Sequence, residues 1–389
     1  IIFTIKRNNS RNTFKLYFYE RKHRMKIQNN KILIGTGGTG GHVFPSLSLA
    51  GYLSKKYNIE IITDKRGLKY LDNFDQSKVK IINSGTIYRK NIFKVVIGII
   101  MILNSFFLSL IFMIRSRPSL VIGMGGYSSF PICLASYCLR IPIIIYENNL
   151  IIGRANKFLI PLANKILVST KSIQGIKKKY IGKVFHSGYI LREHIYKIKK
   201  EKKNISIKKD ISILIMGGSQ SAKIFGEILP NILIKCFQND FNIKIFQQCL
   251  DYQIPKLTKI YNECSIQFEL FSFSHDISKY YKLADLAITR SGASSLSELI
   301  NLRIPFIAIP LPSAADNHQF LNANYFEKKG YGFLLKEKFV ADKLFEILIS
   351  FKKNENKLAT IREKMEEHSD EEELIKSEKL INKILYEQN

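Results

Sequence analysis

The chain has 389 residues, enough for about two to three domains of roughly 150 residues, and its 46% hydrophobic and 24% charged content is ordinary for a globular protein. A small disulfide-stapled scaffold and a mainly disordered chain are thereby excluded. The 60 Lys and Arg outnumber the 32 Asp and Glu, for a formal net charge of +28. Such an excess favours nucleic acid, an anionic membrane or a phosphorylated substrate as partner, although heavy use of Ile, Lys and Asn is an alternative source of the charge. Five scattered cysteines without a CxxC pair fit a reducing compartment and no zinc knuckle.

The first 24 residues are basic and aromatic, without the uninterrupted apolar core of a secretory signal. Met25 is a better start than Ile1, because the residues after it lead directly into a predicted strand. Residues 1–24 are therefore predicted to be a disordered or non-native extension, with a mitochondrial-type presequence as the alternative.

Short β-branched runs then alternate with longer amphipathic stretches, the pattern of parallel sheets with crossover helices. A first series of strands is predicted at residues 31–34, 60–63, 120–122, 141–146, 165–168 and 184–186, and a second at 211–216, 243–247, 265–270, 286–289 and 305–309. The Lys-rich stretch 197–210 between them predicts a linker. We expect one α/β domain over residues 25–196, a second over 211–360, and a C-terminal helix over 361–389.

Residues 95–114 form a twenty-residue segment without a charge, long enough to span a membrane. Predicted strands on either side of it, at residues 80–82 and 120–122, belong to one α/β unit, however, and a span would place them on opposite sides of a bilayer. A helix that is apolar all round needs apolar cover on both faces. We expect one face to contact the membrane surface near basic residues; a wholly buried helix and a true span are the alternatives.

A glycine-rich turn follows the first predicted strand, at residues 35–41 (GTGGTGG). Glycines let the backbone approach an anion closely, and a helix predicted to begin near Pro45 offers free N–H groups. The spacing is neither the dinucleotide fingerprint nor a Walker motif, so a phosphate cradle and a tight turn without ligand both remain open. His42 ends this turn at the mouth of the expected cleft, where it is a candidate for proton transfer or phosphate contact.

Two further groups of polar residues follow strands in the first half. A second glycine turn, at residues 123–129 (GMGGYSS), again lies between a strand and a helix. Glu147 and Asn149 end the strongest apolar strand, where ligand-facing groups belong in an open α/β sheet. Glu147 is a candidate base and Asn149 a candidate sugar ligand; capping of the following helix is the structural alternative.

The second half repeats the arrangement, with a strand, a glycine turn and a helix at residues 216–221 (MGGSQS). Residues 290–298 (RSGASSLSE) give another helix N-terminus suited to phosphate, with Glu298 about one turn inside it, where a carboxylate can accept hydrogen bonds from both hydroxyls of a ribose. A cluster of amide and imidazole groups at residues 316–323 suits sugar hydroxyls, or caps a helix. Two such domains facing each other predict one cleft between them.

Taken together, residues 37–45 (GGTGGHVFP), 125–127 (GGY), 147–149 (ENN), 217–220 (GGSQ), 290–293 (RSGA), 297–298 (SE), 318–319 (HQ) and 322–323 (NA) closely resemble the MurG family, glycosyltransferase family 28. The match runs in order from about residue 31 to residue 332. This family transfers N-acetylglucosamine from UDP-N-acetylglucosamine to undecaprenyl-pyrophosphoryl-muramoyl-pentapeptide, lipid I, and so forms lipid II in peptidoglycan synthesis, which serves cell-wall biogenesis, cell shape and cell division.

The resemblance implies a GT-B fold, in which two Rossmann-like parallel-sheet domains hold the active site between them, and an inverting, metal-independent transfer at the cytoplasmic face of the inner membrane by a peripheral protein. It implies no cofactor and no nucleic acid, and other cell-wall synthesis proteins as further partners. Carried over by position, the donor-binding residues are Thr39, Gly40, Gly41, Asn149, Arg192, Ser219, Ser274, Ala293, Ser294, Ser295, Leu296, Ser297, Glu298 and Gln319. Those facing the acceptor diphosphate are Gly37, Gly38, Gly125, Gly126 and Tyr127.

The chain also departs from the family pattern. Tyr189-Ile190 stands where the family has Asn-Pro before its arginine, and Ser221 and Phe130 replace glycines. Tyr146 occupies the position of a family histidine, so that histidine is unavailable as a base. Inversion requires a base opposite the leaving UDP, and we favour His42 over Glu147. Without a suitably placed Asp-x-Asp motif, helix N-termini and Arg192 would stabilise the leaving diphosphate. A UDP-N-acetylglucosamine 2-epimerase or a transferase to another lipid is the alternative on the same fold.

Overall fold

The computed structural model describes residues 31–72, 74–82, 85, 92–198, 211–272, 274, 277–354, 356–368 and 370–386. Within them, the side chains of residues 92–94, 193, 218–222 and 371 are not described. The expected extension over residues 1–24 lies outside the described residues, as does most of the expected linker.

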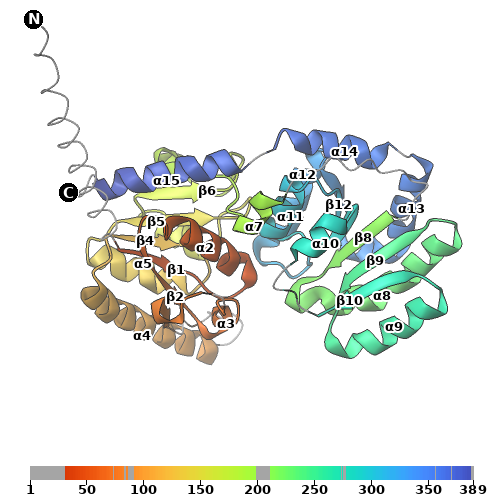
Figure 1. The fold of residues 1–389 in the computed structure, drawn as a ribbon. Helices are drawn as coiled ribbons and strands as arrows, with labels where there is room; N and C mark the ends of the chain where they lie inside the picture. Colours follow the sequence, from red (N-terminus) through yellow and green to blue (C-terminus); the bar gives the residue numbers. More distant parts are fainter. Residues whose placement is uncertain are drawn as a thin grey trace, which may run out of the picture.

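A seven-stranded parallel sheet forms the centre of the N-terminal domain (Figure 1), with the strand order β3-β2-β1-β4-β5-β6-β7. Its strands are nearly continuous runs of Ile, Leu and Val, as expected where helices cover both faces of a parallel sheet. In chain order, the elements are β1 (Lys31–Gly35), α2 (Gly40–Leu53), β2 (Asn58–Thr63), α3 (Lys65–Leu68), β3 (Val79–Ile81), α4 (Ile92–Ser116), β4 (Leu120–Gly123), α5 (Ser129–Cys138), β5 (Ile143–Glu147), α6 (Arg154–Leu159), β6 (Lys165–Val168), β7 (Val184–His186) and α7 (Glu193–Lys197).

The C-terminal domain repeats this plan with six parallel strands in the order β10-β9-β8-β11-β12-β13. Its elements are β8 (Ile211–Met216), α8 (Gly218–Gln238), β9 (Ile243–Gln248), α9 (Ile254–Glu263), β10 (Gln267–Phe271), α10 (Ser278–Leu283), β11 (Leu286–Thr289), α11 (Ala293–Asn301), β12 (Phe306–Ala308), α12 (His318–Lys328), β13 (Gly332–Leu334), α13 (Val340–Lys353) and α14 (Lys357–Glu366). The last helix, α15 (Glu371–Tyr386), follows them in the chain. Short 3-10 turns lie at Gln76–Lys78, Lys178–Lys183, Asp251–Gln253, Ala315–Asn317 and Glu337–Phe339. Two Rossmann-like domains in one chain are the GT-B arrangement that the sequence predicts.

The strand predictions hold to within about two residues, but two features differ. The three-residue strand β13 was not predicted, because its run is too short to show a period. Helix α2 begins at Gly40 rather than near Pro45, so Pro45 lies inside it. Because proline has no N–H, the carbonyl of Gly41 lacks its helical donor four residues later.

The chain passes between the domains twice. Tyr189, Leu191 and Ile195 pack into the core of the C-terminal domain, whereas the neighbouring Ile190 packs into that of the N-terminal domain. Near the C-terminus, where the sequence predicts one helix over residues 361–389, two helices form. Helix α14 packs on the C-terminal domain, and α15 returns to the N-terminal domain and lies across it (Figure 1).

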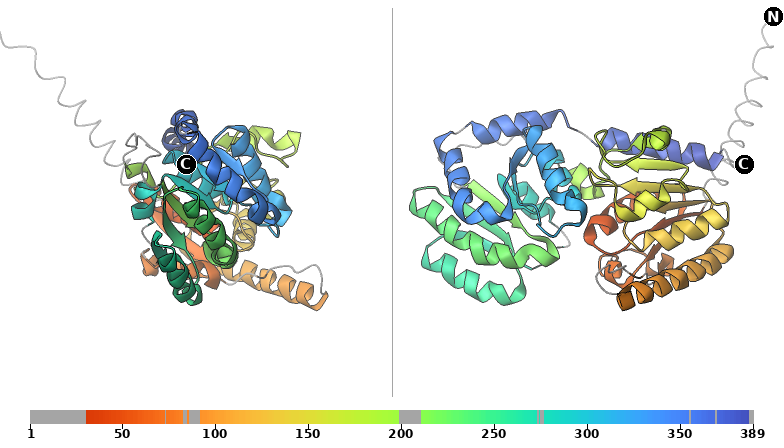
Figure 2. Two further views of the ribbon diagram at one scale, coloured as in Figure 1. Left: turned by 90° about the vertical axis from the view of Figure 1, so that its right-hand side faces the viewer. Right: turned by 180° about the vertical axis from the view of Figure 1, so that it is seen from behind.

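Helix α4 lies at the edge of the N-terminal domain opposite α15 (Figures 1 and 2). One stripe, with Ser105, Ser109 and Met113 spaced four residues apart, faces the domain and is buried. The opposite face is open: ten apolar side chains are between 39% and 59% exposed, namely those of Val96, Ile97, Ile99, Ile100, Met101, Leu103, Phe107, Leu108, Ile111 and Ile114. The alternative of a wholly buried helix is therefore wrong. Among the described residues, this is the one helix long and apolar enough to span a membrane.

Candidate functional site in the cleft between the domains

The two glycine turns of the N-terminal domain pack directly against each other. Gly38, Gly125 and Gly126 have φ values of +84°, +87° and +77°, a conformation that glycine adopts without strain. A Cβ atom on Gly37 would lie 2.5 Å from the Ser128 hydroxyl oxygen, and one on Gly126 would lie 3.1 Å from the Gly37 carbonyl oxygen. Because side chains do not fit between the turns, their backbones form a single surface at the carboxyl ends of β1 and β4.

His42 lies in the first turn of α2, against this surface. Its Nδ1 is 3.1 Å from the Met124 carbonyl oxygen, which only accepts, so Nδ1 carries the proton and Nε2 of the neutral ring is left as an acceptor. Burial lowers the pKa of His42 below its ordinary value, although the charge of Glu147 and the bond to Met124 raise it in part. The ring is therefore neutral at pH 7, the form that a general base requires.

Asp64, at the carboxyl end of β2, is a site residue that the sequence did not reveal. Its Oδ1 accepts hydrogen bonds from the backbone N–H groups of Gly38 (3.1 Å) and Gly67 (2.8 Å). Its Oδ2 accepts from the Ser128 hydroxyl (2.9 Å) and from Nε and Nη2 of Arg66 (3.1 and 2.7 Å). Burial raises the pKa of Asp64, but these donors outweigh burial and hold it below its usual value. One carboxylate thus joins both glycine turns. Asp64 directly follows a buried strand, as Glu147 ends one, so the rule that ligand-facing groups lie at the carboxyl ends of strands could have identified it.

Glu147 is buried, and its carboxylate is fully engaged within its own loop. Oε1 accepts from the backbone N–H and the side-chain amide of Asn149 (3.0 and 3.1 Å). Oε2 accepts from the N–H of Gly153 (2.8 Å) and the amide of Asn156 (3.0 Å). These four bonds fill the usual lone-pair sites of a carboxylate, and Gly153 is the N-cap of α6. The geometry therefore fits the structural alternative, a cap for the following loop and helix, better than it fits a base.

A chain of hydrogen bonds runs from Tyr146 across the cleft. The Tyr146 hydroxyl accepts from the Ile190 N–H (3.2 Å) and donates to Oδ1 of Asn148 (2.9 Å). The amide of Asn148 donates to the Ser294 hydroxyl (2.8 Å) in the first turn of α11. Ser294 in turn contacts, at 3.5 Å, the Gly41 carbonyl that Pro45 leaves without a helical donor. The tyrosine that replaces the family histidine is thus built into the contact between the domains.

Arg192 and Glu298 form a buried ion pair between α7 and α11. Arg192 Nε and Nη2 donate to the two carboxylate oxygens at 2.8 and 2.7 Å, and the Tyr281 hydroxyl donates to Oε2 at 2.8 Å. The guanidinium also lies 5.2 Å from the centre of the Phe44 ring on α2. Three of about four lone-pair sites on Glu298 are therefore occupied in this structure. Arg192 and Glu298 were both predicted to bind the donor, but nothing in the sequence indicates that they pair with each other.

The remaining predicted donor residues lie around α11. Gly292 is the N-cap of α11, and the first turn contains Ser294 and Ser295. Ala293, Leu296 and Ser297 are buried, and the Ser297 hydroxyl donates to the Ser294 carbonyl at 2.9 Å. The Oε1 atom of half-buried Gln319 accepts from the Leu311 N–H at 2.9 Å, which leaves its amide nitrogen as the donor of the side chain. Ser274 is half-buried between β10 and α10. Ser219 lies in the first turn of α8, but its side chain lies outside the described part of the chain.

One predicted sugar ligand, Asn322, instead holds the domains together, and a predicted donor residue, Thr39, caps a helix. Asn322 is buried; its amide donates to Oδ1 of Asn149 (3.2 Å) and to the Ser291 carbonyl (3.2 Å), while its oxygen accepts from the Leu150 N–H (3.1 Å). Thr39 is the N-cap of α2, its carbonyl accepting from His42 and Val43. At the rim, Arg154 pairs with Asp316 at 2.8 Å across the cleft and also contacts Tyr127.

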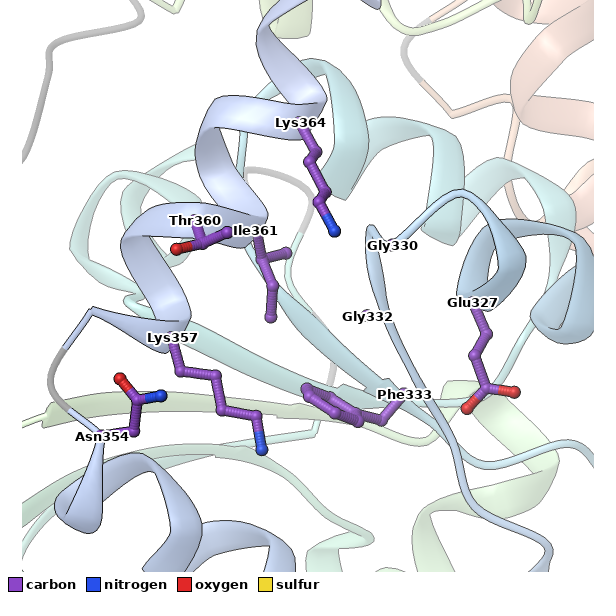
Figure 3. Close-up of a pocket in the computed structure, with 9 residues that line it drawn as sticks. All are labelled: Glu327, Gly330, Gly332, Phe333, Asn354, Lys357, Thr360, Ile361 and Lys364. Carbon is purple, nitrogen blue, oxygen red and sulfur yellow. The ribbon is translucent and has the colours of Figure 1, made fainter.

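Among the described residues, no three His, Cys, Asp or Glu side chains gather as metal ligands. The two prominent cavities lie elsewhere. One of about 410 Å³ opens between α14 and β13, where Lys357 and Lys364 reach down from the helix and Glu327 lies opposite (Figure 3). The other, of about 500 Å³, lies beside the end of α5. Neither contains a predicted site residue.

Comparison with known proteins identifies the family of the chain. The profile of the glycosyltransferase family 28 N-terminal domain matches residues 32–168, and that of the C-terminal domain matches residues 212–378. A UDP-N-acetylglucosamine–N-acetylmuramyl-(pentapeptide) pyrophosphoryl-undecaprenol N-acetylglucosamine transferase of Pelagibacter ubique is 37% identical over 315 residues, 81% of this chain and 87% of the relative. The protein of the same name from Rickettsia felis is 35% identical over 341 residues, covering 82% of this chain and 91% of the relative.

Solved structures give the same result. MurG of Acinetobacter baumannii superimposes with a TM-score of 0.72 at 25% identity, covering 91% of this chain and 99% of the other. The complex of Staphylococcus aureus MnaA with UDP has a TM-score of 0.64 at 14% identity, covering 92% and 97%, which shows the shared fold alone. The chain therefore belongs to the MurG family of glycosyltransferase family 28.

Proposed function

We propose that the protein transfers N-acetylglucosamine from UDP-N-acetylglucosamine to the muramoyl 4-hydroxyl of lipid I, forming lipid II. The observation that carries the proposal is the His42 imidazole, seated against two joined glycine turns and next in the chain to Gly41, whose carbonyl contacts Ser294 in the α11 turn of the opposite domain. The names of the relatives that span most of the chain support the choice of substrates.

The donor is assigned to the C-terminal side of the cleft. The first turn of α11 presents backbone N–H groups and serine hydroxyls, which suit the diphosphate together with Ser219. Glu298 retains one lone-pair site for a ribose hydroxyl, and two more open when Arg192 turns to the diphosphate as leaving-group stabiliser. The amide nitrogen of Gln319 suits the hydroxyls of the sugar as a donor, and Ser274 and Asn149 complete the donor set.

The acceptor is assigned to the N-terminal side. Its pyrophosphate would lie on the surface formed by Gly37, Gly38, Gly125 and Gly126, beside Tyr127, where only backbone approaches the ligand. The Nε2 atom of His42 then removes the proton from the attacking hydroxyl while UDP departs from the opposite face of the sugar. Glu147 holds its own loop in place, and its charge raises the pKa of His42 against the effect of burial. It does not exchange a proton with the substrate.

A membrane surface is proposed as the third partner, contacted by the open face of α4. Ten half-exposed apolar side chains in one helix exceed what a solvated helix of a globular protein presents. Because α4 packs along α5, and β3 and β4 on either side of it belong to one sheet, the helix lies against the domain as an interfacial helix does. The exposed Arg115 and Arg117 at its end suit lipid phosphates and support a peripheral contact with an anionic membrane surface, for which we propose the cytoplasmic face of the cell membrane.

The test is to incubate the purified protein with UDP-N-acetylglucosamine and a short-chain lipid I analogue in chelator, and to follow UDP release and the lipid product. We expect UDP release only when the lipid is present, in step with glycosylated lipid. Turnover of UDP-N-acetylglucosamine without the lipid would instead support an epimerase, and transfer to other lipid-linked sugars but not to lipid I would contradict the acceptor assignment.

A further inference from the structure

Arg66 lies on the short helix α3 beside the first glycine turn, and no role in the proposed reaction has been given to it. Its Nη2 atom would be 3.9 Å from a Cβ atom added to Gly38, and the adjacent Gly67 is packed against Gly37. The side chain is 53% exposed, although its inner edge is bound to a buried carboxylate. The guanidinium thus lies at the open side of the surface formed by the two glycine turns.

Asp64 fixes the position of this guanidinium. Two of the five N–H donors of Arg66, one on Nε and one on Nη2, are directed to Oδ2 of Asp64. Within the described chain, Asp64 is the only hydrogen-bond partner of Arg66, so three N–H donors remain for a ligand. The same carboxylate holds Gly38 and Ser128, one from each glycine turn, which places cation and turns in one rigid unit.

The other side chains around the turns are bound to partners outside the turns or to the backbone, whereas Asp64, the partner of Arg66, is the carboxylate that joins the two turns. His42 is neutral, Arg192 is paired with Glu298, and Arg154 is paired with Asp316 across the cleft. Backbone N–H groups orient a phosphate but carry only partial charge. Arginine, with its planar set of donors, is the side chain best suited to phosphate oxygens.

We propose that Arg66 is a binding residue for the pyrophosphate of the acceptor, and that Asp64 is the positioning residue that aims it and aligns the two glycine turns. This inference rests on the proposed function and extends it to residues outside the motifs that define the family resemblance. Because the Arg66–Asp64 pair is neutral overall, its contribution comes from directed hydrogen bonds rather than long-range attraction, so the expected effect on affinity is about tenfold.

The experiment compares the full-length wild type with Arg66→Ala, Arg66→Lys and Asp64→Asn in the transfer assay, with the lipid I analogue and the donor varied separately. Arg66→Ala should raise the KM for the lipid about tenfold and leave the KM for UDP-N-acetylglucosamine unchanged. Arg66→Lys, which keeps the charge but not the planar donors, should fall between the two. Asp64→Asn should show the same defect toward the lipid plus lower thermal stability, because its amide points donors at donors.

Lys69→Ala is the matched control, since Lys69 is an exposed cation one turn away that lies over the Tyr70 ring instead of the glycine turns. Calorimetry with inorganic pyrophosphate on protein saturated with UDP should give about tenfold weaker binding for Arg66→Ala than for wild type and Lys69→Ala. Three results would overturn the inference and leave the proposed function standing. They are an unchanged KM of Arg66→Ala for the lipid, an equal rise in its KM for the donor, and no binding of pyrophosphate by the wild type. A wild type that does not glycosylate the lipid overturns the proposed function itself.

Discussion

Replacing Tyr146 by Phe removes one hydroxyl from the centre of the contact between the domains. That hydroxyl bonds the Ile190 N–H and Oδ1 of Asn148, both buried, and Tyr146 is itself only 2% exposed. The variant keeps the ring and its packing but leaves a buried donor and a buried acceptor without this partner. An unsatisfied buried group costs about 1–3 kcal/mol, so we expect Tyr146→Phe to lower the free energy of unfolding by about 2 kcal/mol.

The same change should reach the donor site. Without the bond to Oδ1, the Asn148 side chain is held less firmly, and its amide is less well aimed at Ser294 on α11. Loss of that hydrogen bond would cost about 0.5–1.5 kcal/mol, which corresponds to roughly a two- to twelvefold rise in the KM for UDP-N-acetylglucosamine. Urea unfolding followed by tyrosine fluorescence, together with donor kinetics, measures both effects. Tyr137→Phe is the control, because that tyrosine is 54% exposed. A free energy of unfolding within about 0.5 kcal/mol of wild type, the scatter of ordinary surface substitutions, together with an unchanged donor KM would refute the reasoning.

Three further predictions concern α4, Glu147 and His42. The double variant Ile100→Glu, Phe107→Glu should bind anionic vesicles about thirtyfold more weakly in sedimentation, because two half-exposed side chains each lose about 1 kcal/mol of apolar burial. The control Ile375→Glu, at a half-exposed apolar position on α15, should bind normally. Equal binding by the wild type and both variants would contradict the α4 contact. Glu147→Gln should lower the free energy of unfolding by about 1–3 kcal/mol, and with it the melting temperature, because an amide NH2 group then faces backbone N–H donors. A thousandfold loss of transfer at unchanged stability would instead make Glu147 the base. The profile of kcat/KM against pH should have its acid limb below the ordinary histidine pKa of 6.5. Burial lowers the pKa of His42, so the neutral ring is lost only as the pH falls through that lowered pKa. An acid limb above 6.5 would contradict a buried neutral base.

Local patterns in the sequence predict the fold and the location of the cleft well. The alternation of strands and helices, and polar residues at strand ends, depend on neighbours within a few positions, so they can be read along the chain. Both glycine turns, His42 and the α11 turn therefore lie where the sequence places them.

Partners from distant segments are what the sequence does not show. Asp64 resembles any helix-capping aspartate until β1 and β4, which flank each other in the sheet, bring Gly38 and Ser128 to it. Asn322 looks like a sugar ligand, yet the domain contact consumes its amide. The early start of α2 was missed because Pro45 reads as a helix beginning, although the structure uses its missing N–H to free a carbonyl for the other domain.

The central claim of the account is that the neutral imidazole of His42 removes the proton from the acceptor hydroxyl. Its most direct test is the single-turnover rate of transfer from UDP-N-acetylglucosamine to the lipid I analogue by His42→Ala, with donor affinity measured on the same protein. Loss of a general base lowers such a rate by about 10²–10⁴-fold, and because His42 faces the acceptor turns, donor binding should stay within twofold of wild type. A variant that transfers the sugar at the wild-type rate would contradict the claim.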